Sequence, residues 1–381
     1  MHKRQQLKSK SESYFKLLDY WLIIPVLLMT IIGIVVLNSV FKAGYGAGEY
    51  PGNLIKHIGA IMIGILLALL ISLADLPVIG LIGYITYFIS LVLLVIVHID
   101  GFSMYDLTGA DSWIRFPIFG TFQPSELAKV GIAMLLGTYL AKIKKEEISL
   151  WQGLLYIVCI SGIPMFLIAM EPDFGTFFVI LFMILVMVFV YGLKWRYILA
   201  GGITGIIAIP LAWNYYLDEY QKNRIMTFLF PGHDPNSNYH IEQSLKAVAS
   251  GGITGREGNI DIPVPVKESD FIFSAISEYT GFIGTTLLII LIVIFLLRAI
   301  YVAIKMTEFD LASSYMMMGL IAVQGIHFVE NIGMNVGVLP ITGIPLPYIS
   351  SGGSSMVVNY FMFGLMLNVS INYQMMQQND L

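Results

Sequence analysis

Ten apolar runs, each about as long as a membrane-crossing helix, constrain the fold of this chain more than any other feature of its sequence. A helix needs about 20 predominantly apolar residues to cross the hydrocarbon core of a bilayer. Charged residues make up only 12% of the 381 residues, whereas soluble domains carry about 25%, so a soluble globular fold is excluded. We predict an all-α integral membrane protein in which residues 1–381 form one polytopic domain, with about ten helices near residues 20–40, 54–74, 78–98, 125–142, 152–170, 174–193, 197–213, 273–300, 311–331 and 352–372.

The placement of the 21 lysines and arginines predicts which side of the membrane each loop faces. Ten helices put both termini on one side, and most of the basic residues lie in the short segments of that side, which the positive-inside rule assigns to the cytoplasm. Many of the others lie in a single long loop, where the rule carries little weight. We therefore expect a multi-pass protein of the cytoplasmic membrane with both termini inside, residues 1–19 forming the cytoplasmic N-terminus.

Three segments between the runs are too long or too broken to be simple connectors. Residues 99–124 and 214–270 face outward in this topology, and the second is the largest polar stretch of the chain. Loops beyond about 12–15 residues are usually functional or disordered, and we expect an ordered extracellular loop between helices 7 and 8. Residues 337–353 contain three prolines and four glycines, which forbid a continuous helix. We expect a re-entrant or cavity-lining loop there, between helices 9 and 10.

Charge and cysteine content exclude several classes of function. The formal charge of −4, on so few charged residues, leaves no basic face for nucleic acid. The single cysteine, Cys159, excludes a disulfide within the chain. The glycine-rich stretch 251–258 lacks the Gly-Lys-Ser/Thr ending of a phosphate-binding loop. We expect no nucleic-acid partner and no organic cofactor.

Lys129 is predicted to lie at membrane depth, one turn beyond Glu126 on the fourth helix. A charge inside the membrane is costly, so it needs a partner or a function. Asp173 and Glu171 lie between two apolar runs at a matching level, and we expect one of them to be the counter-ion. The pair would either tie helices together or contact substrate, and the sequence leaves both readings open.

Glu268 and Asp270 end the long polar segment, immediately before the eighth helix begins. A carboxylate beside apolar surface has a raised pKa and suits general-base catalysis, and sugar-transfer chemistry commonly uses one or two such groups. Position alone favours the alternative that both are solvated loop acids.

A polar stripe is predicted to line a cavity between the eighth and ninth helices. It comprises Glu278, His327, Glu330 and Asn331. The His/Glu part would also suit a proton relay or a metal site, although no third ligand is evident. In the long loop, His233, Asp234, His240 and Glu242 are further candidates for a divalent cation, without a recognised ligand spacing.

Five blocks of sequence follow one another along most of the chain. They are residues 109–114 with the QPSE run and Lys129, the EPDFGT run at 171–176, residues 243–255, the SDFIF run with residues 278–284, and residues 331–354 with LPITGIPLP. In this order they resemble the SEDS proteins (shape, elongation, division and sporulation), the bacterial membrane polymerases that include RodA and FtsW. The run 264–270 is more similar to RodA proteins of Gram-positive bacteria than to division-type FtsW.

The resemblance implies a ten-helix fold and peptidoglycan glycosyl transfer at the outer face of the bacterial cytoplasmic membrane. In that reaction, lipid II units, which are disaccharide-peptides on undecaprenyl diphosphate, are joined into glycan strands for cell elongation and shape. The family typically acts with a class B penicillin-binding protein that supplies transpeptidation. Lipid II, such a protein and membrane lipids are therefore the expected partners.

The resemblance also assigns roles to individual residues. The essential Asp of the family maps onto Asp270, which would accept the proton of the attacking sugar hydroxyl. The Lys and Asp of the QPSE and PDxGT blocks map onto Lys129 and Asp173. The leaving diphosphate needs cations, which Lys129, Arg224, Lys246 or a divalent ion, Mg or Mn, would supply. The expected set of substrate-binding or ion-pair residues is completed by Glu126, Gln243, Ser244 and Glu268.

Two other functions fit the same composition. A carrier for lipid-linked sugars also has many helices, broken segments and buried charge. A scaffold that only recruits a penicillin-binding protein would tolerate loss of Asp270. The position of the acid-bearing loop on one face of the membrane favours the enzyme.

Overall fold

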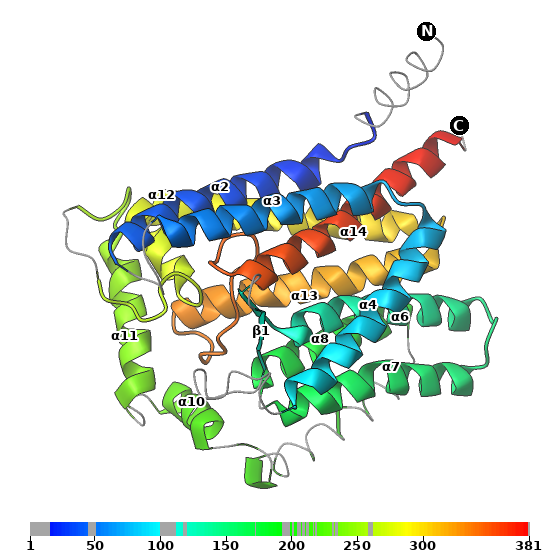
Figure 1. Ribbon diagram of the computed structural model, residues 1–381, viewed down its shortest axis with the longest axis horizontal. Coiled ribbons are helices and arrows are strands. Elements are labelled where there is room, and N and C mark those ends of the chain that lie inside the picture. Colours follow the sequence, from blue (N-terminus) through cyan, green and yellow to red (C-terminus); the bar gives the residue numbers. More distant parts are fainter. Residues whose placement is uncertain are drawn as a thin grey trace.

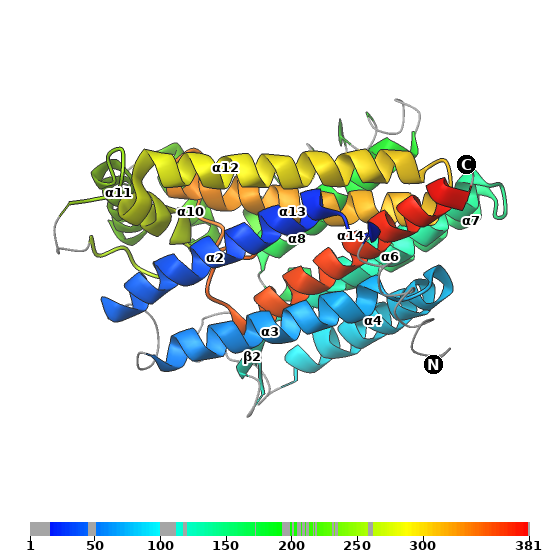
Figure 2. The same ribbon diagram turned by 90° about the horizontal axis from the view of Figure 1, so that it is seen from above.

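The computed structural model describes residues 16–44, 51–99, 112–116, 120–171, 173–192, 219–230, 235–257 and 262–379, with short pieces between residues 199 and 232 besides. Long helices run side by side through this part of the molecule (Figures 1 and 2). They are α2 (Tyr20–Lys42), α3 (Gly52–Ser72), α4 (Leu76–Val97), α6 (Pro124–Lys144), α7 (Leu150–Met170), α8 (Phe174–Tyr191), α12 (Ile272–Met306), α13 (Leu311–Asn335) and α14 (Gly353–Asn379).

The predicted helical membrane fold is confirmed. Eight of these helices are long and apolar enough to cross a membrane. The ninth, α6, coincides with the predicted span at 125–142 and is less apolar because it carries Glu126, Lys129, Lys142 and Lys144. The predicted span at 197–213 falls largely outside the described residues.

Short elements collect at one end of the bundle, within the two segments that the sequence assigns to the outer face. A two-stranded antiparallel hairpin, β1 (Ile114–Phe116) with β2 (Gly120–Phe122), lies within 99–124, where no strand was expected. The segment 214–270 contains α10 (Glu219–Leu229) and α11 (Pro235–Ser250), which Figure 1 shows at the left of the molecule, with α11 extending down from the left-hand ends of α2 and α12.

The centre of the bundle is formed by α13 and α14, while α3 and α4 expose apolar side chains on the outside. In the most apolar 18-residue window of α14, 83% of the residues are buried, against 28% in α4. Backbones approach closely here, as a Cβ on Gly364 would lie 2.7 Å from the Cα of Ala68 on α3. Small residues permit such packing in membrane proteins, where dispersion contacts drive helix association.

Helix α12 is broken at Gly281, whose φ of 64° suits glycine and interrupts the helical hydrogen bonds. The freed N–H groups of Phe282 and Ile283 donate to the carbonyls of Gly252 (2.9 Å) and Ile253 (3.1 Å). The glycine-rich stretch that follows α11 is therefore hydrogen-bonded to the break. These bonds satisfy backbone groups that lipid could not satisfy. This attachment fixes the glycine-rich stretch against α12.

Candidate functional site

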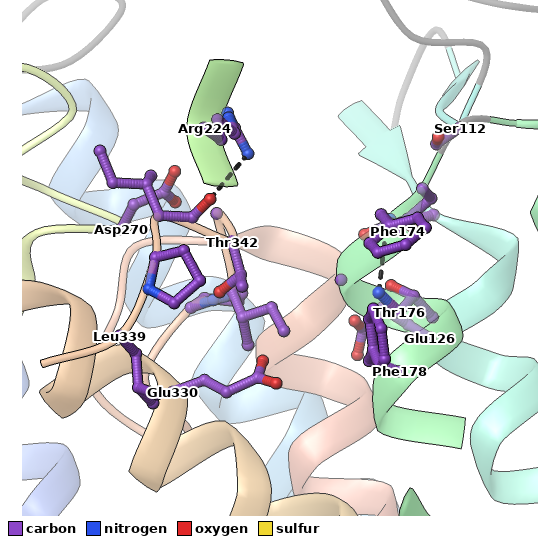
Figure 3. Close-up of a pocket in the computed structure, with 18 of the residues that line it drawn as sticks. Ser112, Glu126, Phe174, Thr176, Phe178, Arg224, Asp270, Glu330, Leu339 and Thr342 are labelled. Carbon is purple, nitrogen blue, oxygen red and sulfur yellow. Dashed lines mark hydrogen bonds between the residues drawn. The ribbon is translucent and has the colours of Figure 1, made fainter. Parts of the chain in front are cut away.

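A cavity of about 650 Å³ opens between two walls at the end of the bundle that carries α10 (Figure 3). One wall holds Asp270, Arg224 and residues 339–345 of the segment between α13 and α14. The other wall holds the starts of α6 and α8, with Glu126, Phe174 and Thr176 among its residues (Figure 3). Four carboxylates line the cavity, against one cationic side chain among the described residues, Arg224; the four are Glu126, Asp173, Asp270 and Glu330.

Asp270 is held in place through its backbone. Its carbonyl accepts hydrogen bonds from the side-chain amides of Asn331 (2.9 Å) and Asn335 (3.0 Å), two residues one turn apart on α13. Asn335 also accepts from the N–H of Ser274 in the first turn of α12 (2.9 Å). Two buried amides thus fix the approach of the chain to α12, and the side chain of Asp270 projects into the cavity (Figure 3).

The electrostatic surroundings of Asp270 favour a basic carboxylate. Burial raises the pKa of Asp270 above its ordinary value, an effect that a hydrogen bond from Ser269 and the charge of Arg224 partly offset. The Oγ of Ser269 donates to Oδ1 at 3.0 Å. Arg224 donates from Nη1 to the carbonyl of Ile341 (3.2 Å), which holds its guanidinium at the cavity wall. Burial also raises the pKa of Glu268, but this residue is not among those that line the cavity.

Asp173 joins the starts of two helices on the opposite wall. Its Oδ1 accepts from the N–H of Thr176 (3.1 Å), so it caps α8. Its Oδ2 accepts from the side-chain amide of Gln123 (2.6 Å), the N-cap residue of α6. Sequence reasoning missed Gln123 as a partner, although its place directly before a Pro-initiated helix was a usable signal.

Lys129 pairs with Glu126 rather than with the expected Asp173 or Glu171. The Nζ–Oε1 distance to Glu126 is 2.6 Å, and Nζ also donates to Nε2 of His327 at 3.0 Å. The prediction of a partner on another helix was wrong because Glu126 stands one turn away on α6, while the carboxylate of Asp173 is engaged by Gln123 and the start of α8.

Only one member of the predicted polar stripe lines the cavity, and that member is Glu330. His327 faces Lys129, and Asn331 holds the backbone of Asp270. Glu278 is fully buried and lies within 3.1 Å of Arg256 and 2.5 Å of Lys267. Its Oε1 also accepts from the N–H of Ile262 at 3.1 Å, so Glu278 anchors the segment between α11 and α12.

The α11 residues lie outside the cavity lining. The Oγ of Ser244 donates to the carbonyl of Asn335 (2.8 Å), which attaches α11 to α13. Lys246 lies 3.8 Å from Glu242, and both side chains are more than half exposed. Gln243 is half-buried on the same helix.

The expected metal ion has no ready ligand set in the described part of the chain. No three His, Cys, Asp or Glu side chains converge there as a metal site. His233 and Asp234 lie outside the described residues. The described residues do not form a metal centre on their own.

The family follows from comparison with known proteins. A family model described as "Cell cycle protein", for FtsW, RodA and SpoVE, matches residues 19–375. The chain belongs to this family. The MrdB peptidoglycan glycosyltransferase of Escherichia coli K12 is 28% identical over 363 residues, covering 93% of this chain and 95% of that protein. Stage V sporulation protein E of Bacillus subtilis is 35% identical over 288 residues, 73% of this chain and 76% of that protein.

Solved structures agree with this assignment. A chain in a structure of a peptidoglycan synthase complex matches with a TM-score of 0.79 at 29% identity, covering 93% of this chain and 98% of that chain. RodA of Thermus thermophilus matches with a TM-score of 0.67 at 28% identity, over 93% and 96% of the two chains. The SEDS resemblance seen in the sequence is confirmed, whereas the comparisons do not test the Gram-positive subtype.

Proposed function

We propose that this protein is a peptidoglycan glycosyltransferase that polymerises lipid II at the outer face of the cytoplasmic membrane, in cell elongation and shape maintenance. The observation that carries the proposal is Asp270, a half-buried carboxylate with a raised pKa in the wall of a cavity of about 650 Å³. MrdB, which matches almost the whole chain, is named a peptidoglycan glycosyltransferase.

Asp270 acts as the general base in this proposal. The 4-hydroxyl oxygen of the acceptor sugar attacks C1 of the donor sugar, and its proton passes to the carboxylate of Asp270. The new O4–C1 bond forms as the bond between C1 and the diphosphate oxygen breaks, which releases undecaprenyl diphosphate. A single displacement inverts C1, so the base and the leaving group lie on opposite faces of the donor sugar.

Arg224 stabilises the leaving group. It is the one cationic side chain among the described cavity-lining residues, so the charge that develops on the diphosphate meets its guanidinium. Lys129 is engaged by Glu126, and Lys246 lies on the exposed side of α11, so these two lysines contribute less directly.

The same proposal places both termini in the cytoplasm and a class B penicillin-binding protein beside this chain. The likeness to a chain of a peptidoglycan synthase complex supports such a partner. The apolar face of α12 carries exposed side chains suited to a partner helix, among them Ile283, Leu287 and Ile290.

Polymer formation tests the function. The purified full-length protein, alone and with its cognate penicillin-binding protein, is incubated with labelled lipid II, and glycan strands are separated by gel. We expect polymer from the native protein and a fall in rate of about 10²–10⁴ for Asp270→Asn, the range for loss of a general base. Lipid II movement across vesicles without any polymer would support a carrier. Polymer that depends only on the partner, and is unchanged by Asp270→Asn, would support a scaffold.

A further inference from the structure

A second cavity, of about 370 Å³, lies at the other end of the helices. It is formed by the start of α2, the last part of α12 and the end of α14, which Figures 1 and 2 show together at the end remote from α11. Arg298, in its wall, follows the first residue of α12 by 26 residues, which corresponds to about 39 Å of helix. The cavity that contains Asp270 faces one membrane surface, and this second cavity therefore faces the other.

The carboxylate in the wall of this second cavity, Asp19, already has hydrogen-bond partners. Asp19, only 2% exposed, accepts the Nε–H of Arg298 on both carboxylate oxygens, at 3.1 and 2.9 Å. The Oγ of Ser370 donates to Oδ2 of Asp19 at 2.6 Å. The carboxylate joins α2, α12 and α14 and has little capacity left for a ligand.

The remaining polar side chains of the cavity can all donate hydrogen bonds. Only the Nε of Arg298 bonds to Asp19, and no hydrogen bond within the described residues engages the two Nη groups. The arginine side chain is 28% exposed and lies over the ring of Tyr301, at 5.1 Å. Gln374, Gln377 and Tyr373 also line the space, and their side chains carry amide and hydroxyl donors. A guanidinium fork among amide and hydroxyl donors matches a phosphate group.

The rim of the cavity indicates where that phosphate comes from. Trp21, Tyr20 and Tyr301 are 65%, 52% and 46% exposed, and all three line the cavity. Aromatic residues of this kind mark the level of lipid headgroups at the ends of membrane helices. Basic pockets between membrane helices on the cytoplasmic side bind anionic headgroups. We propose that this cavity binds the phosphate of an anionic phospholipid from the leaflet opposite to the Asp270 cavity.

Native mass spectrometry of the full-length protein in detergent tests the assignment. The protein is titrated with phosphatidylglycerol, with phosphatidylcholine, and with phosphatidylglycerol in the presence of inorganic phosphate. We expect one phosphatidylglycerol to bind saturably, more tightly than phosphatidylcholine and without displacement by equimolar phosphate. The paired variant Asp19→Asn with Arg298→Gln keeps the buried contact neutral and should weaken this binding about tenfold, as for loss of a charge-assisted hydrogen bond.

Two further variants separate binding from folding. Gln374→Leu with Gln377→Leu leaves the Asp19–Arg298 pair intact and should also weaken phosphatidylglycerol binding several-fold. Lys42→Gln, at the other end of α2, should bind like the native protein. Native-like binding by both paired variants, or equal binding of phosphatidylcholine, would overturn the proposal. Displacement of phosphatidylglycerol by equimolar inorganic phosphate would show that the cavity binds a soluble phosphate and not a lipid headgroup.

Discussion

Lys129 and Lys267 are both almost completely buried, with 1% and 0% of their side chains exposed, yet they belong to different kinds of site. Lys267 lies 2.5 Å from Glu278, donates to the carbonyl of Ile262 and lies over the ring of Tyr279. Lys129 pairs with Glu126, a residue that borders the cavity. A buried charge therefore indicates function only when its partner reaches a space that substrate can enter.

The largest effect on stability is expected at Glu278. Glu278→Ala leaves Arg256 and Lys267 without their shared carboxylate and detaches the segment between α11 and α12 from this helix. Removing one partner of a buried pair costs about 3–5 kcal/mol, so the thermal unfolding temperature in detergent should fall strongly. Arg256→Gln is the milder control, because it leaves the Lys267–Glu278 pair in place. An unchanged unfolding temperature for Glu278→Ala would contradict the structural role given to this cluster.

Lys129→Met should destabilise less, by about 1–3 kcal/mol, because Glu126 borders the cavity and water can replace part of the lost contact. The paired variant Lys129→Met with Glu126→Leu removes both charges and should recover stability without recovering polymerisation. Polymerisation of lipid II by this paired variant at the native rate would show that Lys129, like Lys267, has only a structural role.

The pH dependence of polymerisation should reveal the raised pKa of Asp270. A general base works only when deprotonated, so the rate should fall about tenfold for each pH unit below the pKa of Asp270, which lies above the ordinary Asp value. Arg224 lowers that pKa, so Arg224→Gln should move the acidic limb of the profile to higher pH. An acidic limb that does not move with Arg224→Gln would contradict the proposed electrostatic coupling between Arg224 and Asp270.

The smallest effect is expected at the cap of α8. Asp173→Ala removes the acceptor for the N–H of Thr176 and for Gln123, which should cost about 0.5–2 kcal/mol of stability. Asp173→Asn keeps a capping oxygen and should lose less. Equal unfolding temperatures for these two variants would show that Asp173 does not cap the helix.

The sequence predicts depth in the membrane far better than rotation about a helix axis. Apolar runs locate the helices because each must cover the same hydrocarbon thickness, and they also place Asp270 just outside α12. They do not show which neighbour a side chain faces. Glu278 was expected in the cavity. Instead, the segment between α11 and α12 packs against the break at Gly281 and brings Arg256 and Lys267 to Glu278, from 22 and 11 residues away in the sequence.

The Lys129 pair shows the same limit. Its charge and depth were predicted, but its partner depends on how α6 and α8 are capped, since Gln123 and Thr176 occupy Asp173. The second cavity had no signal in the sequence, because its residues come from three helices that are far apart along the chain.

The most direct test of the central claim compares two neighbouring acids. Asp270 lines the cavity and Glu268 does not, although burial raises the pKa of both. Initial rates of lipid II polymerisation are measured for Asp270→Asn and Glu268→Gln in preparations with equal unfolding temperatures. We expect a loss of at least about 100-fold for Asp270→Asn and a near-native rate for Glu268→Gln. Equal rates for the two variants would contradict this expectation.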